Sequence, residues 1–224
     1  MTPPAAAPIV NFSFPHLWQA EILPARPAIL PARHFTYPRH AEEIERGALE
    51  VLVRPANPDS QPGARGLASE TGEIKSISSP NWNTQPFLAT CALGFRDPAV
   101  PTGLWSTPNP EELCAVSGGY AYLILTTAPE RFTMIPYRPV LQVLSSPANN
   151  LLLFLSNRTI LAWGQTGQLW ESEKLSDEGL TITSLEIRDA TSDATNILCG
   201  LGWQMKSDQE IPFALDLRTG LCIE

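Results

Sequence analysis

A net charge of -8 on a chain of 224 residues argues against nucleic acid or an anionic membrane surface as the main partner, since both attract clustered lysine and arginine. With 43% hydrophobic and 17% charged residues, the chain is able to bury a sizeable core and lacks the composition of a disordered protein. The 22 prolines, about twice the ordinary share, argue against long helices as the dominant element, because proline lacks an amide donor and clashes inside a helix.

The N-terminal segment is rich in proline, as in "LPARPAILPARHFTYPRH", and we expect it to be extended, along another surface or at the edge of a sheet. The following segment, "RHAEEIERGALEV", has the clearest helical signal, which predicts a short helix near residues 40–46 that ends at Gly47. We therefore expect a proline-rich segment with a short helix over residues 1–46 and a single β-repeat domain over residues 47–224.

Two further strands are predicted before the regular part of the chain. The run "ALEVLVRP" indicates one strand, and "FLATCALGF" indicates a second, buried one. Between them, residues 55–86 are polar and rich in proline, glycine and serine, which predicts a long loop with a weak strand at "EIKSIS".

Three units of similar organisation follow, at residues 103–139, 140–175 and 180–224. Each spans roughly 36–45 residues, the length of a propeller blade, and holds up to four β-prone runs separated by turn residues. In the second unit these runs are "VLQVLSS", "LLLFLS", "TILAWG" and "QLWESEK". We therefore expect an all-β fold of tandem four-stranded meanders, arranged as a partial or small propeller. Either the two earlier strands supply part of a fourth unit, or the units form an open or sandwich-like stack.

The stretch "ILAWGQTGQLWESEKL" places Trp163 and Trp170 on either side of a Gly-Gln-Thr-Gly turn. It resembles the A-x-D-x-x-T-G-x-x-x-W hairpin of quinoprotein-type and WD-like β-propellers, although Leu161 and Trp163 replace the Ala and Asp of the motif. The third unit has a closer copy of the motif, in Ala214, Asp216, Thr219 and Gly220. The resemblance covers about residues 103–224 and implies that the two tryptophans pack between neighbouring blades.

The same resemblance implies a quinone cofactor. Quinoprotein enzymes, however, are typically larger, exported and built from more blades, so we expect no cofactor. The chain is also similar in character to bacterial proteins, a likeness that implies no particular activity.

Ser117, in "AVSGG", is the best candidate nucleophile, but Ala115 replaces the first glycine of the G-x-S-x-G motif. All three histidines precede Ser117, whereas an α/β-hydrolase requires a later one. The order His40, Asp97, Ser117 fits a chymotrypsin-like arrangement, yet the flanking residues do not resemble that family. Ser117 is more simply the end of a strand before a glycine turn, so we expect no enzyme and keep a serine hydrolase with Ser117 and His40 as an alternative.

The four cysteines lie in largely apolar runs and lack the C-x-x-C spacing of zinc sites. We therefore predict four reduced, mostly buried thiols, a cytoplasmic location and no metal site. The start of the chain has no basic region followed by a continuous apolar run, so we predict no signal peptide.

The absence of a recognisable catalytic motif favours a non-catalytic protein–protein interaction module, for example an immunity or adaptor protein that binds a basic partner. Five aromatic and arginine side chains near predicted strand ends belong to the types enriched at interface hot spots. These candidates are Tyr120, Tyr137, Arg138, Arg158 and Trp203. Ordinary packing between blades is the alternative role for each, and a structural subunit of a larger assembly is the alternative function for the chain. The identity of the partner, the number of blades and the oligomeric state stay open.

Overall fold

A computed structural model describes the chain over residues 7–39, 47–56, 85–186 and 196–223. The described residues form β-strands and one 3-10 turn, η4 (Pro147–Asn149), which confirms the all-β fold class. The helix predicted near residues 40–46 and the weak strand "EIKSIS" lie outside the described residues. Within the described part of the chain, no helix has the length and apolar character needed to cross a membrane.

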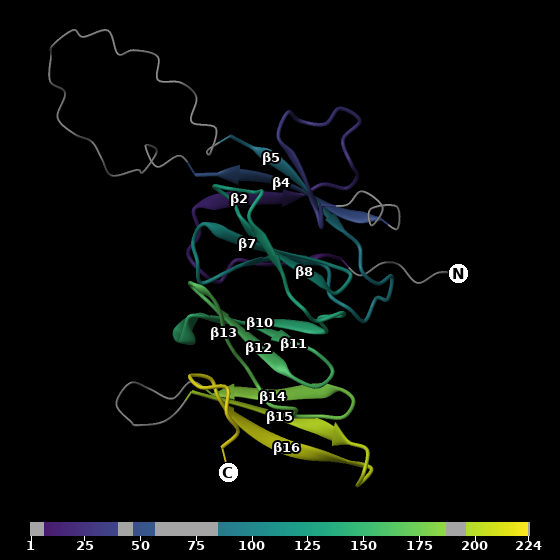
Figure 1. Cartoon of the computed structure of the whole chain (residues 1–224), viewed down its shortest axis with the longest axis vertical. Helices are drawn as coiled ribbons and strands as arrows, with labels where there is room; N and C mark the ends of the chain where they lie inside the picture. Colours follow the sequence, from purple (N-terminus) through teal and green to yellow (C-terminus); the bar gives the residue numbers. More distant parts are fainter. Residues whose placement is uncertain (1–6, 40–46, 57–84, 187–195, 224) are drawn as a thin grey trace, which may run out of the picture.

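Four sheets follow one another along the longest axis of the molecule (Figure 1). Sheet 1 consists, in spatial order, of β2 (Trp18–Ile22), β4 (Ala48–Pro55), β5 (Phe87–Ala92) and β3 (His34–Tyr37). Sheet 2 consists of β1 (Ile9–Asn11), β6 (Gly103–Ser106), β7 (Glu112–Ser117), β8 (Tyr120–Leu125) and β9 (Phe132–Met134). Sheet 3 consists of β10 (Gln142–Ser146), β11 (Leu151–Leu155), β12 (Ile160–Gly164) and β13 (Gly167–Glu171). Sheet 4 consists of β14 (Leu180–Glu186), β15 (Ile197–Gln204) and β16 (Gln209–Asp216).

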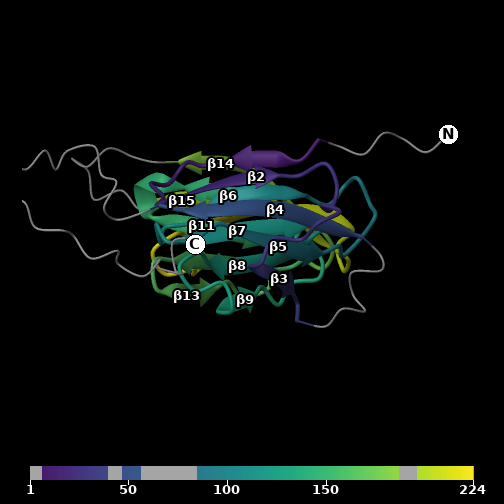
Figure 2. The ribbon, with the colours of Figure 1, turned by 90° about the horizontal axis from the view of Figure 1, so that it is seen from above.

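The three sequence units correspond to sheets 2, 3 and 4, and the two earlier strands pair antiparallel as β4 and β5 of sheet 1. Sheet 4 has three strands, and a single bridge between Leu215 and Cys222 takes the place of a fourth. The proline-rich N-terminal segment supplies edge strands, as expected: β1 pairs parallel to β6, and β2 and β3 flank sheet 1. Seen along the stack, β2 and β14 lie toward one side and β3, β9 and β13 toward the other (Figure 2).

Each junction between sheets encloses a hydrophobic cluster. In a strand, successive side chains point to opposite faces, so Leu113 of β7 packs toward sheet 1 and the next residue, Cys114, packs toward sheet 3. Sheets 2 and 3 therefore bury both faces. This explains the continuous apolar runs "LLLFL" and "ILAWG", in which every residue of β11 and β12 is buried.

The two tryptophans of the β12–β13 hairpin lie on opposite faces of sheet 3. Trp163 packs in the cluster between sheets 2 and 3, and its Nε1–H donates to Glu112 Oε2 at 2.8 Å. Trp170 packs toward sheet 4, and its Nε1–H donates to the carbonyl oxygen of Leu217 at 3.0 Å. The interpretation of both side chains as packing between neighbouring units is confirmed.

The prediction that most cysteines are buried is correct for two residues and wrong for the other two. All four thiols are free, but Cys199 is only partly buried and Cys222 is exposed. Cys199 pairs with Ala214 on the face of β15 that points away from sheet 3, and Cys222 lies in the C-terminal tail. An apolar neighbourhood in the sequence therefore does not bury a residue when its sheet is the last of the stack.

The closer copy of the hairpin motif forms the turn after β16, where Gly220 packs against Trp170 of sheet 3. Gly220 has a φ of +73°, and a Cβ at this position would lie 2.6 Å from the Trp170 ring. Asp216 stabilises the same turn, because its Oδ1 accepts the backbone N–H of Arg218 at 2.9 Å. The glycine is therefore required both by the backbone conformation and by the contact between sheets 3 and 4.

We predict that Gly220→Ala lowers the free energy of unfolding by about 2–4 kcal/mol, because it combines strain at positive φ with overpacking against Trp170. The matched control is Gly179→Ala, since Gly179 has a φ of +89° but a Cβ added to it would meet no other atom within 4 Å. Gly179→Ala should cost only about 1 kcal/mol. Urea unfolding of the two variants measures the difference, and equal losses would show that the contact with Trp170 contributes nothing.

Candidate functional site

The connections between sheets meet the turns within sheets along one side of the stack, to the right in Figure 1, where strands of all four sheets begin or end; we call this side the loop end. Residues 93–102, which connect sheet 1 to sheet 2, contact the β7–β8 turn: the N–H of Phe95 donates to the carbonyl oxygen of Gly118 at 2.8 Å. The β9–β10 connection contacts the same turn, through the N–H of Val140 and the carbonyl oxygen of Gly119 at 2.8 Å.

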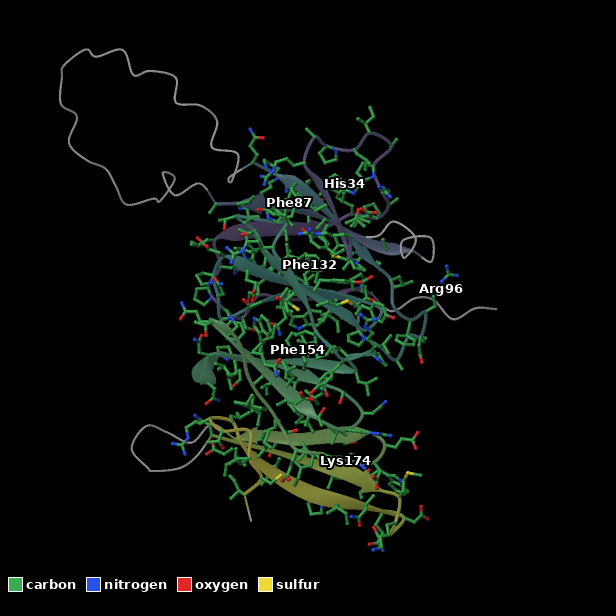
Figure 3. All side chains as sticks on the ribbon, viewed as in Figure 1. His34, Phe87, Arg96, Phe132, Phe154 and Lys174 are labelled. Atoms are coloured by element: carbon green, nitrogen blue, oxygen red, sulfur yellow. The ribbon has the colours of Figure 1, made fainter. Side chains whose placement is uncertain are left out.

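The loop end continues across sheets 3 and 4. The N–H of Gly179, in the connection between these sheets, donates to the carbonyl oxygen of Asn157 in the β11–β12 turn at 2.9 Å. The N–H of Asp177 donates to the carbonyl oxygen of Trp203 at 2.7 Å, at the end of β15. Figure 3 shows Arg96 and Lys174, from the first and last of these connections, on this side of the molecule. Three of the five candidates from the sequence, Tyr137, Arg138 and Arg158, belong to these turns and connections. The other two lie at strand ends beside them: Tyr120 is the first residue of β8, and Trp203 is the last but one of β15.

Tyr120 and Arg138 are in direct contact at the loop end. The Arg138 guanidinium carbon lies 5.3 Å from the centroid of the Tyr120 ring, within the range of a cation–π interaction. The Phe95 ring packs edge-on against Tyr120, with the centroids 5.9 Å apart. The structure thus brings two of the predicted residues together with an exposed phenylalanine that is not among the candidates from the sequence.

Tyr137 has a structural role in addition to any contact with a partner. It packs against the cluster between sheets 2 and 3, and its hydroxyl donates to Glu171 Oε1 at 2.8 Å. The Thr159 hydroxyl lies 2.8 Å from the Tyr137 oxygen and completes the network. Burial, reinforced by the Glu171 carboxylate, raises the pKa of the Tyr137 hydroxyl, so this side chain stays a neutral donor.

Arg158 and Trp203 lie farther along the loop end, on either side of Asp177. The Arg158 Nε–H donates to the carbonyl oxygen of Asp177 at 3.1 Å, which links the β11–β12 turn to the next connection. Trp203 pairs with Glu210 on the outer face of sheet 4, away from sheet 3. The five candidates therefore form a band along the loop end rather than one compact site.

Phe95, which contacts Tyr120, also lines a groove of about 800 Å³. Its walls come from β1, from the start of β10 and from the connection 93–102, with buried Trp105 among the lining residues. Phe95 and Ile9 line the groove and are 41% and 47% exposed, and Arg96 and Asp97 add charged groups. This mixture of exposed apolar surface and a few polar groups is typical of a binding site for an apolar ligand or segment.

β1, which lines the groove through Ile9 and Asn11, also has a free edge. β1 pairs only with β6, and no other described strand lies along its second edge. The N–H of Ile9 donates to the carbonyl oxygen of Thr102 at 2.9 Å, so the alternation along a strand directs the backbone N–H and C=O of Val10 toward the free edge. Val10 is 57% exposed. An exposed apolar edge strand of this kind is a template for pairing with another extended chain.

A second, more polar pocket of about 400 Å³ lies at the junction of sheets 2 and 3. It contains Glu112, whose carboxylate accepts the hydrogen bond from Trp163, together with Arg131 and Thr133. Burial raises the pKa of the Glu112 carboxyl, and hydrogen bonds from Trp163 and Thr107 oppose this effect. Glu112 is the one carboxylic acid among the described residues that line this pocket. Its hydrogen bond to Trp163 indicates that it orients the indole ring.

The structure does not show the residues of the hydrolase alternative as a catalytic site. Ser117 is 0% exposed, and its Oγ makes no hydrogen bond within the described residues. Asp97 is exposed, and its Oδ1 accepts the backbone N–H of Ala99 at 2.9 Å. His40 lies outside the described residues. A substrate would have no access to the Ser117 hydroxyl in this conformation.

No group of three or more His, Cys, Asp or Glu side chains within the described ranges is arranged to hold a metal ion. Sheet 1 does contain a buried polar chain: Thr90 Oγ1 donates to Glu50 Oε2 at 2.6 Å and lies 3.0 Å from His34 Nε2. Burial lowers the pKa of His34, with a further contribution from Arg26. These three groups satisfy one another across strands β4, β5 and β3, and they stabilise the sheet.

Sequence reasoning missed the groove because its walls come from three distant segments. The signal was present in Phe95 and Arg96, which follow a strong strand in a proline-rich connection, but it has no meaning until β1 is placed beside them. Comparison of the chain with protein-family models, with curated proteins and with solved structures gives no match. The resemblance to propeller hairpins therefore stays a prediction that depends on the residues of this chain alone.

We predict that Glu112→Gln becomes progressively more stable relative to the wild type as the pH rises above 4.5, the ordinary value for this carboxyl. A pKa raised in the folded state means that the protonated form contributes stability below the unfolded pKa, and this contribution is lost as the pH rises through the folded pKa. Glutamine keeps an acceptor for Trp163 but cannot ionise. Urea unfolding of both proteins from about pH 4 to about pH 8 tests the trend. A difference that is independent of pH, or that changes in the opposite direction, would contradict it.

Proposed function

We propose that the chain is a non-catalytic protein–protein interaction module that binds an extended, apolar segment of a partner protein in the groove beside β1. The observation that carries the proposal is the coincidence of a free strand edge with a large groove. A bound segment could pair with the backbone of Val10 and direct alternate side chains toward Phe95 and Trp105, which is the geometry of strand addition. Backbone pairing would supply affinity, and the groove would supply selectivity.

The residues around the groove suit a protein ligand. Tyr120 and Arg138 belong to the types enriched at hot spots, and their mutual contact restricts their motion before binding. The net charge of -8 favours a partner with an overall positive charge, because long-range attraction would accelerate its association at low salt. An immunity or adaptor role is one form of this function. A cytoplasmic location is part of the same proposal, and the four free thiols support it.

The hydrolase alternative gains no support from the buried Ser117 hydroxyl. The alternative of a structural subunit is favoured by a different observation, the apolar outer face of sheet 4, where partly buried Leu201 and Trp203 lie on the side away from sheet 3.

We predict that Val10→Pro weakens binding of an extended peptide by about tenfold or more, equivalent to about 1.4 kcal/mol. Proline removes the backbone N–H at the free edge, and an edge strand tolerates its fixed φ. The matched control, Val10→Ala, shortens the side chain but keeps the backbone donor, and should retain affinity within about threefold. Peptides selected from a displayed ten-residue library against the wild-type chain serve as ligands, with affinities measured by fluorescence anisotropy.

The arginine that contacts Tyr120 provides a second, independent variant. Arg138→Ala removes the guanidinium over the Tyr120 ring without removing a buried group, since Arg138 is exposed. It should weaken the same peptides, because the hot-spot pair is lost, while thermal unfolding is nearly unchanged. Selected peptides that bind Val10→Pro and Arg138→Ala as tightly as the wild type would locate the binding surface elsewhere, and a library that yields no binder would remove the basis of the proposal.

A further inference from the structure

The two ends of the sheet stack differ in chemistry. The outer face of sheet 1 is polar: Glu21 forms an ion pair with Arg54 at 3.6 Å, and the chain of Glu50, Thr90 and His34 lies on the same face. Leu88 on this face is 0% exposed, and the connection from β2 to β3 crosses this end of the stack (Figure 1). Sheet 1 is therefore closed against further stacking, as terminal units of repeat proteins usually are.

The middle of the outer face of sheet 4 is apolar, and the polar residues Thr181, Ser184 and Glu210 border it. The register of β15 and β16 places Cys199, Leu201 and Trp203 on the face opposite to buried Leu198 and Leu215. Gly200 and Gly202 alternate with them and approach the sheet 3 side, since a Cβ on Gly202 would lie 2.1 Å from the carbonyl oxygen of Leu175. The face that carries Leu201 has no such neighbour among the described residues.

Neighbouring strands extend the same apolar surface. Pro212 and Ala214 of β16 lie opposite Leu201 and Cys199. In the C-terminal tail, Leu221 and Ile223 are 64% and 38% exposed, and the N–H of Ile223 donates to the carbonyl oxygen of Ala214 at 2.8 Å. None of the described residues forms a further layer on this face, in contrast to the three junctions inside the chain, where each sheet face of this kind is covered by another sheet.

We infer that the outer face of sheet 4 is a homodimer interface, in which it packs against the same face of a second copy of this chain. A sheet is the layer that covers such a face at every junction of this protein. Of the described terminal sheets, sheet 4 is the one that a second copy presents uncovered, because the outer face of sheet 1 is polar and covered by the β2–β3 connection. The contact is therefore between identical faces related by a two-fold axis, which closes the assembly at two copies and prevents open-ended stacking.

The size of the face places the contact among the small, weak interfaces. A strand spacing of about 4.8 Å and a rise of about 3.3 Å per residue give a face of roughly 400–500 Å² per copy, or roughly 1,000 Å² in total. This is near the lower limit for a specific interface, so we expect a reversible dimer with a dissociation constant of roughly 1–100 μM. The inference does not depend on the proposed function, because the groove lies at the loop end and not on this face.

Sedimentation equilibrium of the full chain at several concentrations tests the inference. The mass of the wild type should rise from 24.5 kDa toward twice that value. Leu201→Glu places a charge at the centre of the contact and should weaken dimerisation at least tenfold. Ile29→Glu is the matched control, since Ile29 is 88% exposed at the opposite end of the stack, and it should dimerise like the wild type.

A second variant guards against misfolding of the first. Leu221→Glu changes a 64% exposed side chain of the tail, and it should keep the thermal stability of the monomer while weakening dimerisation. A wild-type chain that stays at the monomer mass up to about 500 μM would overturn the inference, because that concentration is well above the dissociation constant expected for the dimer. A dimer that persists unchanged in folded Leu221→Glu and Leu201→Glu would also overturn it, and would place the contact on another surface.

Discussion

Burial of both faces of sheets 2 and 3 is the constraint on which the rest of the structure depends. A sheet with two apolar faces has no stable exposed surface, so it requires a layer on each side. β11 and β12 illustrate this requirement, because Leu152 and Leu153 are adjacent in sequence yet pack in different clusters, one with sheet 2 and one with sheet 4. The order of the stack follows from it: two central sheets and two sheets that cover them.

The candidate surfaces arise where this packing ends. The groove forms beside a sheet edge, where β1 has a described neighbour on one side only, and the apolar face of sheet 4 forms where the sequence of layers stops. The connections between sheets must cross from one layer to the next, and this places residues such as Phe95 and Arg138 at the same end of the molecule. The core therefore determines where the exposed residues of both candidate surfaces lie.

The strands of sheets 2 and 3 could be predicted from the sequence because both of their faces are buried, which leaves long apolar runs separated by turn residues. The short strands β1 and β3 could not, because each pairs in parallel with a strand far away in the sequence, Ile9 with Gly103 and His34 with Leu88. No local pattern encodes such a pairing. The expectation of a proline-rich edge segment was correct as a class, but the register that creates the groove is a tertiary property.

The candidate site shows the same division between local and tertiary information. Residue type and position near strand ends were sufficient to place Tyr120 and Arg138 at the loop end, where they touch. The same criteria could not show that Tyr137 would bond to Glu171, 34 residues away, or that Trp163 would bond to Glu112. The apolar side chains on the outer face of β15 could have been predicted from the sequence, since Cys199, Leu201 and Trp203 alternate with two glycines.

Native-state hydrogen exchange, resolved by strand, tests most directly whether the doubly covered sheets hold the stack together. Amide protection reports the free energy of the opening that exposes each hydrogen bond. The account predicts that β7, β11 and β12 exchange most slowly and open together with global unfolding, whereas β1, β2 and β14 exchange through smaller openings at lower free energy. Equal protection in all four sheets, or the highest protection in sheet 4, would contradict the claim that burial on both faces determines the stability of this fold.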